Sequence, residues 1–226
     1  MTQKYIYHHL GLGDHIICNG MVRHFCEIYD NITLFCYSRN YNNVKYMYRD
    51  LKNLDIFYFD TETEIINFIS SNGLNANLIR VGFEKLDQYL KQMTFDKAFY
   101  KIAGLDFKIR LKKFYVERDF EQENNLLNHL NPNKEKYIFI HDDPSRGYSI
   151  NIQSNYKIIK NNLNYKFFDY LKVLENAEEV HYMQSSFADL INSYELKHPK
   201  LFLHKKVRNY NDAIYSVGLN EVTLVN

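Results

Sequence analysis

The chain has 226 residues, enough for one large domain or two small ones with a sizeable core in either case. Its formal net charge is +1, so its overall charge gives no sign of a nucleic-acid or anionic-membrane partner. No apolar run is long enough for a signal peptide or a membrane span, and we therefore expect a cytoplasmic protein.

The three cysteines are Cys18, Cys26 and Cys36. Cys18 and Cys26 are expected on one helix, where eight residues separate their backbones by about 12 Å at 1.5 Å per residue. That distance is too long for a disulfide. Zinc sites use closer pairs of ligands. We therefore expect buried, reduced thiols and no metal site.

Strand and helix patterns alternate through the first half of the chain. Apolar, β-rich runs predict strands at 4–9, 31–37, 54–59 and 75–81. Helical spacing predicts helices at 14–29, 42–52 and 61–71. The last of these begins with Thr61 as a cap and has acids in its first turn. Such an alternation is typical of a parallel, doubly wound sheet.

The second half begins after a different stretch. Residues 95–130 show little strand alternation until "RLKKFYV", and a charged helix is expected from Arg118 to Leu130. "NPNKEK" at 131–136 is turn chemistry, after which the alternation restarts. Strands are then expected at 137–143, 178–183 and 200–207, with helices at 166–177 and 185–194. The sequence therefore predicts an α/β protein with two small halves, residues 1–118 and 119–226.

The stretch "GLGDH" lies between the first expected strand and the first expected helix. Gly11, Gly13 and His15 are candidates for an anion site, because amides at a helix N-terminus bind anions. The stretch is not the dinucleotide fingerprint, whose third glycine would fall at Ile16, and no P-loop motif is present. Asp14 is expected as a helix N-cap, as a carboxylate facing the ligand site at the carboxyl end of the strand, or as both together.

Two further polar segments follow expected strands of the second half. In "HDDPSRGYS", Arg146 is suited to bind a phosphate, with His141 and Asp142 beside it, although a simple polar turn around Pro144 is the alternative. In "MQSSFADLI", Ser185 or Ser186 caps a helix whose free amides could bind an anion. A plain serine cap without a ligand is equally compatible with that sequence.

Taken together, these segments resemble the GT-B type of nucleotide-sugar glycosyltransferase. "GLGDHIICNGMVRHF" is similar to the Gly-Asp opening of heptosyltransferases, and "YIFIHDDPSRGYSI" resembles a donor-domain strand with its phosphate-binding loop. "SSFADLI" is similar to the helix that faces the donor nucleotide in fucosyltransferase-like relatives. The E-x-x-x-x-x-E and HxRR donor motifs are absent, so the nucleotide and the sugar stay open.

The resemblance implies two Rossmann-like domains facing each other across a cleft, with a glycan or small-molecule acceptor bound by the first. A nucleotide-sugar donor would bind to the second domain, without a metal or other cofactor. Asp14 would be the general base. The donor would be bound by residues of the second half, namely His141, Asp142, Arg146, Ser185, Ser186 and Phe187.

Two other functions are compatible with parts of the pattern. One is a non-catalytic Rossmann-like module that binds a nucleotide or a sugar. The other is a nucleotide-sugar epimerase, which the missing third glycine of the dinucleotide loop disfavours.

Overall fold

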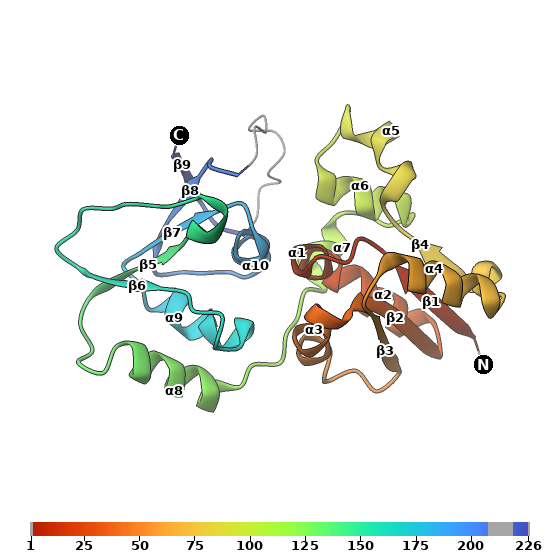
Figure 1. The fold of residues 1–226 in the computed structure, drawn as a ribbon, viewed down its shortest axis with the longest axis horizontal. Helices are drawn as coiled ribbons and strands as arrows, with labels where there is room; N and C mark the ends of the chain where they lie inside the picture. The colour runs from red at the N-terminus through yellow and green to blue at the C-terminus, as the bar shows by residue number, and fades with distance from the viewer. Residues whose placement is uncertain (1, 208–218, 226) are drawn as a thin grey trace. The chain divides into compact units, whose positions relative to one another are not determined.

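The computed structural model describes residues 2–207 and 219–225, which form two compact units (Figure 1). The chain passes from one unit to the other between Glu117 and Arg118, beside the boundary expected after residue 118. Each unit has its own parallel sheet, and no sheet described in the structure runs through both. The α/β class with two Rossmann-like units is therefore confirmed.

The sheet of the first unit has four parallel strands in the order β3-β2-β1-β4. Their bounds are β1 (Gln3–Tyr7), β2 (Asn31–Tyr37), β3 (Leu54–Phe59) and β4 (Leu78–Arg80). All four match strands expected from the apolar runs. The carboxyl ends of parallel strands share one edge, which is where α/β sheets bind ligands.

Seven α-helices belong to the described part of the first unit. They are α1 (Leu12–Ile17), α2 (Asn19–Ile28), α3 (Tyr41–Met47), α4 (Glu62–Ser71), α5 (Asp87–Leu90), α6 (Phe95–Ile102) and α7 (Lys108–Lys112). The expected start of α4 is confirmed, because Thr61 Oγ1 accepts from Glu64 N at 3.3 Å and Glu64 accepts from Thr61 N.

Two expectations for these helices are wrong. The helix expected at 14–29 is divided at Cys18, which lies between α1 and α2 with ψ near −1°. The strand-like alternation of 110–116 is not a strand, because Lys108–Lys112 forms α7. Within this helix Arg110 is buried and Lys112 is exposed.

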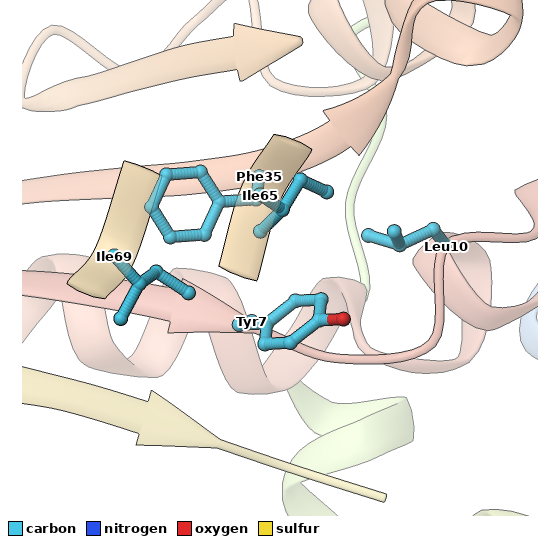
Figure 2. Packing of buried hydrophobic residues seen from close by; sticks show 5 residues of the cluster. All are labelled: Tyr7, Leu10, Phe35, Ile65 and Ile69. Atoms are coloured by element: carbon cyan, nitrogen blue, oxygen red, sulfur yellow. The ribbon is translucent and has the colours of Figure 1, made fainter. Parts of the chain in front are cut away.

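A cluster of buried side chains fixes the exit of β1 (Figure 2). Tyr7 of β1, Leu10 of the following loop and Phe35 of β2 pack with Ile65 and Ile69 of α4. The hydroxyl of Tyr7 donates to Glu62 Oε1 at 2.6 Å, at the start of α4. The segment that leads into α1 therefore packs against this hydrophobic cluster through Leu10.

The close packing of α2 against α7 requires a glycine. A Cβ at Gly20 would lie 2.5 Å from the carbonyl oxygen of Ile109 and 2.7 Å from that of Arg110. Both are backbone atoms, which cannot move aside as a flexible side chain does. Gly20 therefore lets the two helix backbones approach each other.

The sheet of the second unit has five parallel strands in the order β6-β5-β7-β8-β9. Their bounds are β5 (Tyr137–His141), β6 (Lys157–Lys160), β7 (Glu179–Met183), β8 (Lys200–His204) and β9 (Val222–Val225). The helices here are α8 (Phe120–Leu130), α9 (Leu171–Glu175) and α10 (Ser186–Ser193). The strands β6 and β9, which are the two edges of this sheet, were not expected.

Two composition-based expectations concern thiols and membranes. Cys18, Cys26 and Cys36 are all buried and free, as expected. Burial raises the pKa of the Cys26 and Cys36 thiols to about 12, so both are protonated and unreactive. Of the helices described here, none has the length and apolar character needed to cross a membrane.

Candidate functional site

The stretch "GLGDH" after β1 forms the start of helix α1. Gly11 is the N-cap of α1, and Gly13 lies within the helix. Asp14 is the third helical residue, so the expectation that it is the N-cap is wrong, although its Oδ2 accepts from Gly11 N at 3.1 Å. A Cβ at Gly11 would lie 2.7 Å from that same oxygen, so the glycine leaves room for the carboxylate to fold back. The amide of Gly11 is thereby occupied by Asp14.

The expectation that His15 is an anion-binding loop residue is wrong. It lies in α1, is fully buried, and its ring packs edge-on against that of His8 at 4.5 Å. Neither ring nitrogen of His15 has a hydrogen-bond partner within the described residues. Burial lowers the pKa of both histidines, to about 4 for His8. These neutral imidazoles belong to the interior of the unit.

The exit of β5 presents an acceptor atom at the carboxyl edge of the second sheet. His141 is 9% exposed, and its Nδ1 lies 2.9 Å from Asn161 Oδ1. Burial lowers the pKa of His141, so the ring is neutral. Since the amide oxygen only accepts, Nδ1 carries the proton and Nε2 keeps a lone pair. That Nε2 is buried without a hydrogen-bond partner in the described parts of the chain.

The loop after β5 is closed by its own acidic residues. Asp142 is buried, and its Oδ2 accepts from Lys160 Nζ at 2.7 Å and from Ile150 N at 3.0 Å. These contacts hold the loop to β6, and the expected contact of Asp142 with a donor stays a prediction. Arg146 donates from Nε to Asp143 Oδ2 at 2.5 Å, while its side chain is 58% exposed. The arginine is thus at the surface and accessible from solvent.

The start of α10 combines a capped helix with a buried amide donor. Ser185 is the N-cap, as expected, and its Oγ accepts from Phe187 N at 3.2 Å. Ser186 is the first residue of the helix, and the ring of Phe187 lies 4.4 Å from that of His141. Gln184 is 7% exposed, with Oε1 accepting from Val207 N. Its Nε2 is buried and has no partner in the described residues.

The structure therefore brings His141, Ser185 and Phe187 together at the carboxyl ends of β5 and β7. Sequence reasoning missed Gln184 and Asn161. Gln184 directly precedes the serine cap, and that adjacency was the one available signal for it. A buried acceptor, a buried donor and the amides of a helix N-terminus suit a polar ligand that carries an anionic group.

One hollow of the second unit lies beside Asp142, whose partners Ile150 and Lys160 line it. It has a volume of about 420 Å³ and is lined by Ile140, Ile150, Asn151, Ile152, Gln153, Ile158 and Lys160. None of the expected site residues lines it. Across the described residues, His, Cys, Asp and Glu side chains form no group of three or more with the spacing of a metal site.

No protein-family model matches the chain, and no curated protein sequence is similar to it. Solved structures do match. A glycosyl transferase family 9 structure from Veillonella parvula matches with a TM-score of 0.62 at 8% identity, covering 99% of this chain and 85% of that one. The ADP-heptose LPS heptosyltransferase II of E. coli matches with a TM-score of 0.60 at 7% identity, covering 100% of this chain and 90% of that one.

A third matching structure belongs to a longer chain, of which the match covers a smaller share. The iron-containing dodecameric glycosyltransferase TibC of enterotoxigenic E. coli matches with a TM-score of 0.54 at 12% identity. The match covers 89% of this chain and 57% of that one. At such identities the likeness concerns the fold. The chain therefore has the GT-B type fold of these three glycosyltransferase structures.

Proposed function

We propose that this protein is a glycosyltransferase that moves a sugar from a nucleotide-sugar donor to a hydroxyl group of a glycan or small-molecule acceptor. The donor binds to the second unit, at the carboxyl ends of β5 and β7. The observation that carries the proposal is a pair of buried polar atoms beside the N-terminus of α10, His141 Nε2 and Gln184 Nε2, which have no hydrogen-bond partner within residues 2–207 and 219–225. Leaving such atoms unpaired costs about 1–3 kcal/mol each, a cost that a bound ligand removes.

Each group at this site has a role in the proposed donor complex. The backbone amides of the first turn of α10, which follow the Ser185 cap, stabilise the negative charge of the diphosphate. Arg146 adds a second positive group, with a planar guanidinium that suits a phosphate. His141 accepts from a donor N–H or O–H, and Gln184 donates. Stabilising the departing diphosphate in this way needs no bound metal.

Asp14 is the proposed general base, which takes the proton from the attacking hydroxyl. The proton moves to the carboxylate, the acceptor oxygen bonds to the anomeric carbon, and the bond to the diphosphate breaks. Asp14 shares one of its oxygens with Gly11 N. The carboxylate is an acceptor with two oxygens, so capping its own helix start is compatible with the role of base.

A second function is favoured by that same capping contact. If the carboxylate of Asp14 only orders the start of α1, the chain is a binding module that holds a nucleotide or a sugar without turning it over. Both functions predict donor binding, and only the transferase predicts release of the nucleoside diphosphate.

A screen followed by an assay separates these functions. Thermal denaturation with ADP-, GDP- and UDP-linked sugars should reveal a donor, since a ligand at a hundred times its dissociation constant adds about 2.7 kcal/mol of stability. Release of nucleoside diphosphate, with acceptor present and with EDTA in the buffer, then tests transfer and metal independence. Binding without release would favour the module, and no stabilisation by any donor would contradict both functions.

A further inference from the structure

Three side chains form a hydrogen-bonded chain across β7 and β8 of the second unit. The Oε2 of Glu179 lies 3.1 Å from Nε2 of His181, and Nδ1 of His181 lies 3.1 Å from Nε2 of His204. Both histidines are only 5% exposed, and the ring of His181 stacks on Phe202 at 4.6 Å. The rings are therefore fixed in place by packing.

The direction of each hydrogen bond follows from the first acceptor. A carboxylate only accepts, so Nε2 of His181 carries a proton and donates to Glu179. When Nε2 carries the one proton of the His181 ring, Nδ1 has a lone pair and accepts from Nε2–H of His204. The remaining nitrogen of His204, Nδ1, keeps a lone pair. It has no hydrogen-bond partner among the described residues.

His204 is the last residue of β8, and it lies beside Met183, the last residue of β7, in the register of the sheet. Gln184, with its unpartnered amide nitrogen, follows Met183 directly. The lone pair of His204 is therefore located at the same edge of the sheet as the proposed donor site. Burial, with smaller contributions from His181 and Lys206, lowers the pKa of His204 to about 4, so the ring stays neutral.

We propose that Glu179 and His181 are positioning residues that hold His204 as its Nε2–H tautomer, so that its Nδ1 accepts a hydrogen bond from a sugar hydroxyl of the bound nucleotide sugar. The ligand half of this inference rests on the proposed function. The hydroxyl belongs either to the ribose or to the transferred sugar, and the binding experiment below distinguishes these sources.

The tautomers are read directly by NMR. In protein labelled with ¹⁵N-histidine at neutral pH, His204 should show a protonated Nε2, an unprotonated Nδ1, and a coupling across the hydrogen bond from its Nε2 to Nδ1 of His181. A proton on Nδ1 of His204, or a shared proton bonded to His181, would overturn the inference.

A charge reversal at Glu179, the first member of the hydrogen-bonded series, tests whether it positions His204. In Glu179→Lys the ammonium only donates, so His181 Nε2 must accept and His181 Nδ1 then donates to Nε2 of His204. His204 should therefore switch to the Nδ1–H tautomer, although it does not contact the substituted residue. Glu178→Lys is the matched control, because Glu178 is adjacent and pairs with Lys136 instead. The control should keep the wild-type tautomers. The inference fails if Glu179→Lys keeps them as well.

Two substitutions at His204 test the ligand contact by calorimetry with the nucleotide sugar found in the screen. His204→Leu should weaken binding about 2- to 12-fold, the range of one neutral hydrogen bond. His204→Asn keeps an acceptor oxygen close to the position of Nδ1 and should bind within about twofold of wild type. Unchanged affinity in the leucine variant would overturn the ligand contact.

The same measurements with the corresponding nucleoside diphosphate locate the hydroxyl. An equal loss with both ligands assigns it to the ribose, and a loss with the nucleotide sugar alone assigns it to the transferred sugar. If wild-type protein binds no nucleotide, the proposed function fails and takes the ligand contact with it. The tautomer measurement still decides whether Glu179 and His181 position His204.

Discussion

Two polar strand-to-helix junctions of this molecule differ in their hydrogen bonding. After β1, the backbone amide of Gly11 at the helix start donates to Asp14 of the same helix, and the ring of His15 packs against that of His8. After β7, Ser185 caps α10, while Gln184 keeps a buried nitrogen without a partner in the described residues. A polar strand–loop–helix segment therefore does not identify a ligand site by itself. Buried nitrogens without a partner in the described residues occur at both junctions: those of His8 and His15 are fully buried, whereas His141 and Gln184 are 9% and 7% exposed and lie beside the start of α10.

The largest expected effect tests whether the first junction is catalytic as well as structural. Asp14→Asn should lower kcat by about 10²- to 10⁴-fold, because the amide cannot take the acceptor proton. Stability should change by less than about 1 kcal/mol, since the amide oxygen can still accept from Gly11 N. Steady-state kinetics and thermal denaturation measure the two effects separately.

The fold offers a matched control for this substitution. Glu64 occupies the same third position of α4 and makes the same backbone contact to its own cap, Thr61. Glu64→Gln should cost a similar amount of stability and leave kcat unchanged. Wild-type turnover in Asp14→Asn would remove the carboxylate from the mechanism and leave the first junction purely structural.

The next effect tests whether the second junction binds the donor. Arg146→Ala should weaken nucleotide-sugar binding by about 1.5–3 kcal/mol, the range of a hydrogen bond to a charged group. Arg146→Lys should restore only part of the affinity, because an ammonium cannot make a bidentate contact. Calorimetry measures both variants.

Lys136→Ala controls for the loss of a positive charge. Lys136 precedes β5 and pairs with Glu178, so it lies at the amino edge of the same sheet. This variant should bind the donor as wild type does. Equal affinity in Arg146→Ala and wild type would mean that Arg146 only closes its turn with Asp143.

The sequence predicted the parts of this molecule that repeat a simple pattern. The inner strands β2 and β5 are mostly apolar runs, which is typical of strands buried on both faces. The edge strands β6 and β9 have only four residues each, KIIK and VTLV, and show no strand alternation, so such short segments resemble loops. The cap of α10 was predicted because serine before an apolar run has one favoured role.

The sequence could not predict where polar side chains turn inward. Asp142 and Arg146 are charged residues of the same segment, "HDDPSRGYS". Asp142 is buried against Lys160, whereas Arg146 is exposed. That difference depends on β6, a strand distant in sequence that was not expected. The Glu179–His181–His204 chain has the same origin, because the register of β7 and β8 determines which residues become neighbours.

A packing substitution tests how rigidly the first junction is held. Gly20→Ala should destabilise the protein by about 1–3 kcal/mol, the usual cost of overpacking, because its Cβ would meet two carbonyl oxygens of α7. Alanine otherwise favours a helix over glycine by about 1 kcal/mol, so the sign of the effect is diagnostic. Urea denaturation measures it. A stabilised Gly20→Ala protein would show that α2 and α7 can separate without cost.

The smallest expected effect separates the interiors of the two junctions by their response to acid. Burial lowers the pKa of His8 to about 4 and also lowers that of His15, whereas an unfolded histidine has a pKa near 6.5. Below pH 6.5 the unfolded chain therefore takes up protons that the folded chain does not. Each such histidine lowers the free energy of unfolding by up to about 1.4 kcal/mol per pH unit as the pH falls toward its folded-state pKa.

The substitution His15→Leu isolates this contribution. Neither nitrogen of His15 has a hydrogen-bond partner among the described residues, so leucine removes a titrating group without breaking a hydrogen bond. Urea denaturation at pH 7 and pH 5 should show a smaller loss of stability on acidification in the variant than in wild type. Comparing the two proteins cancels the contribution of the carboxylates, which titrate in both. Parallel pH dependences would mean that His15 is already paired or protonated in the folded protein, and the first junction would then hold an unrecognised polar contact like those of the second.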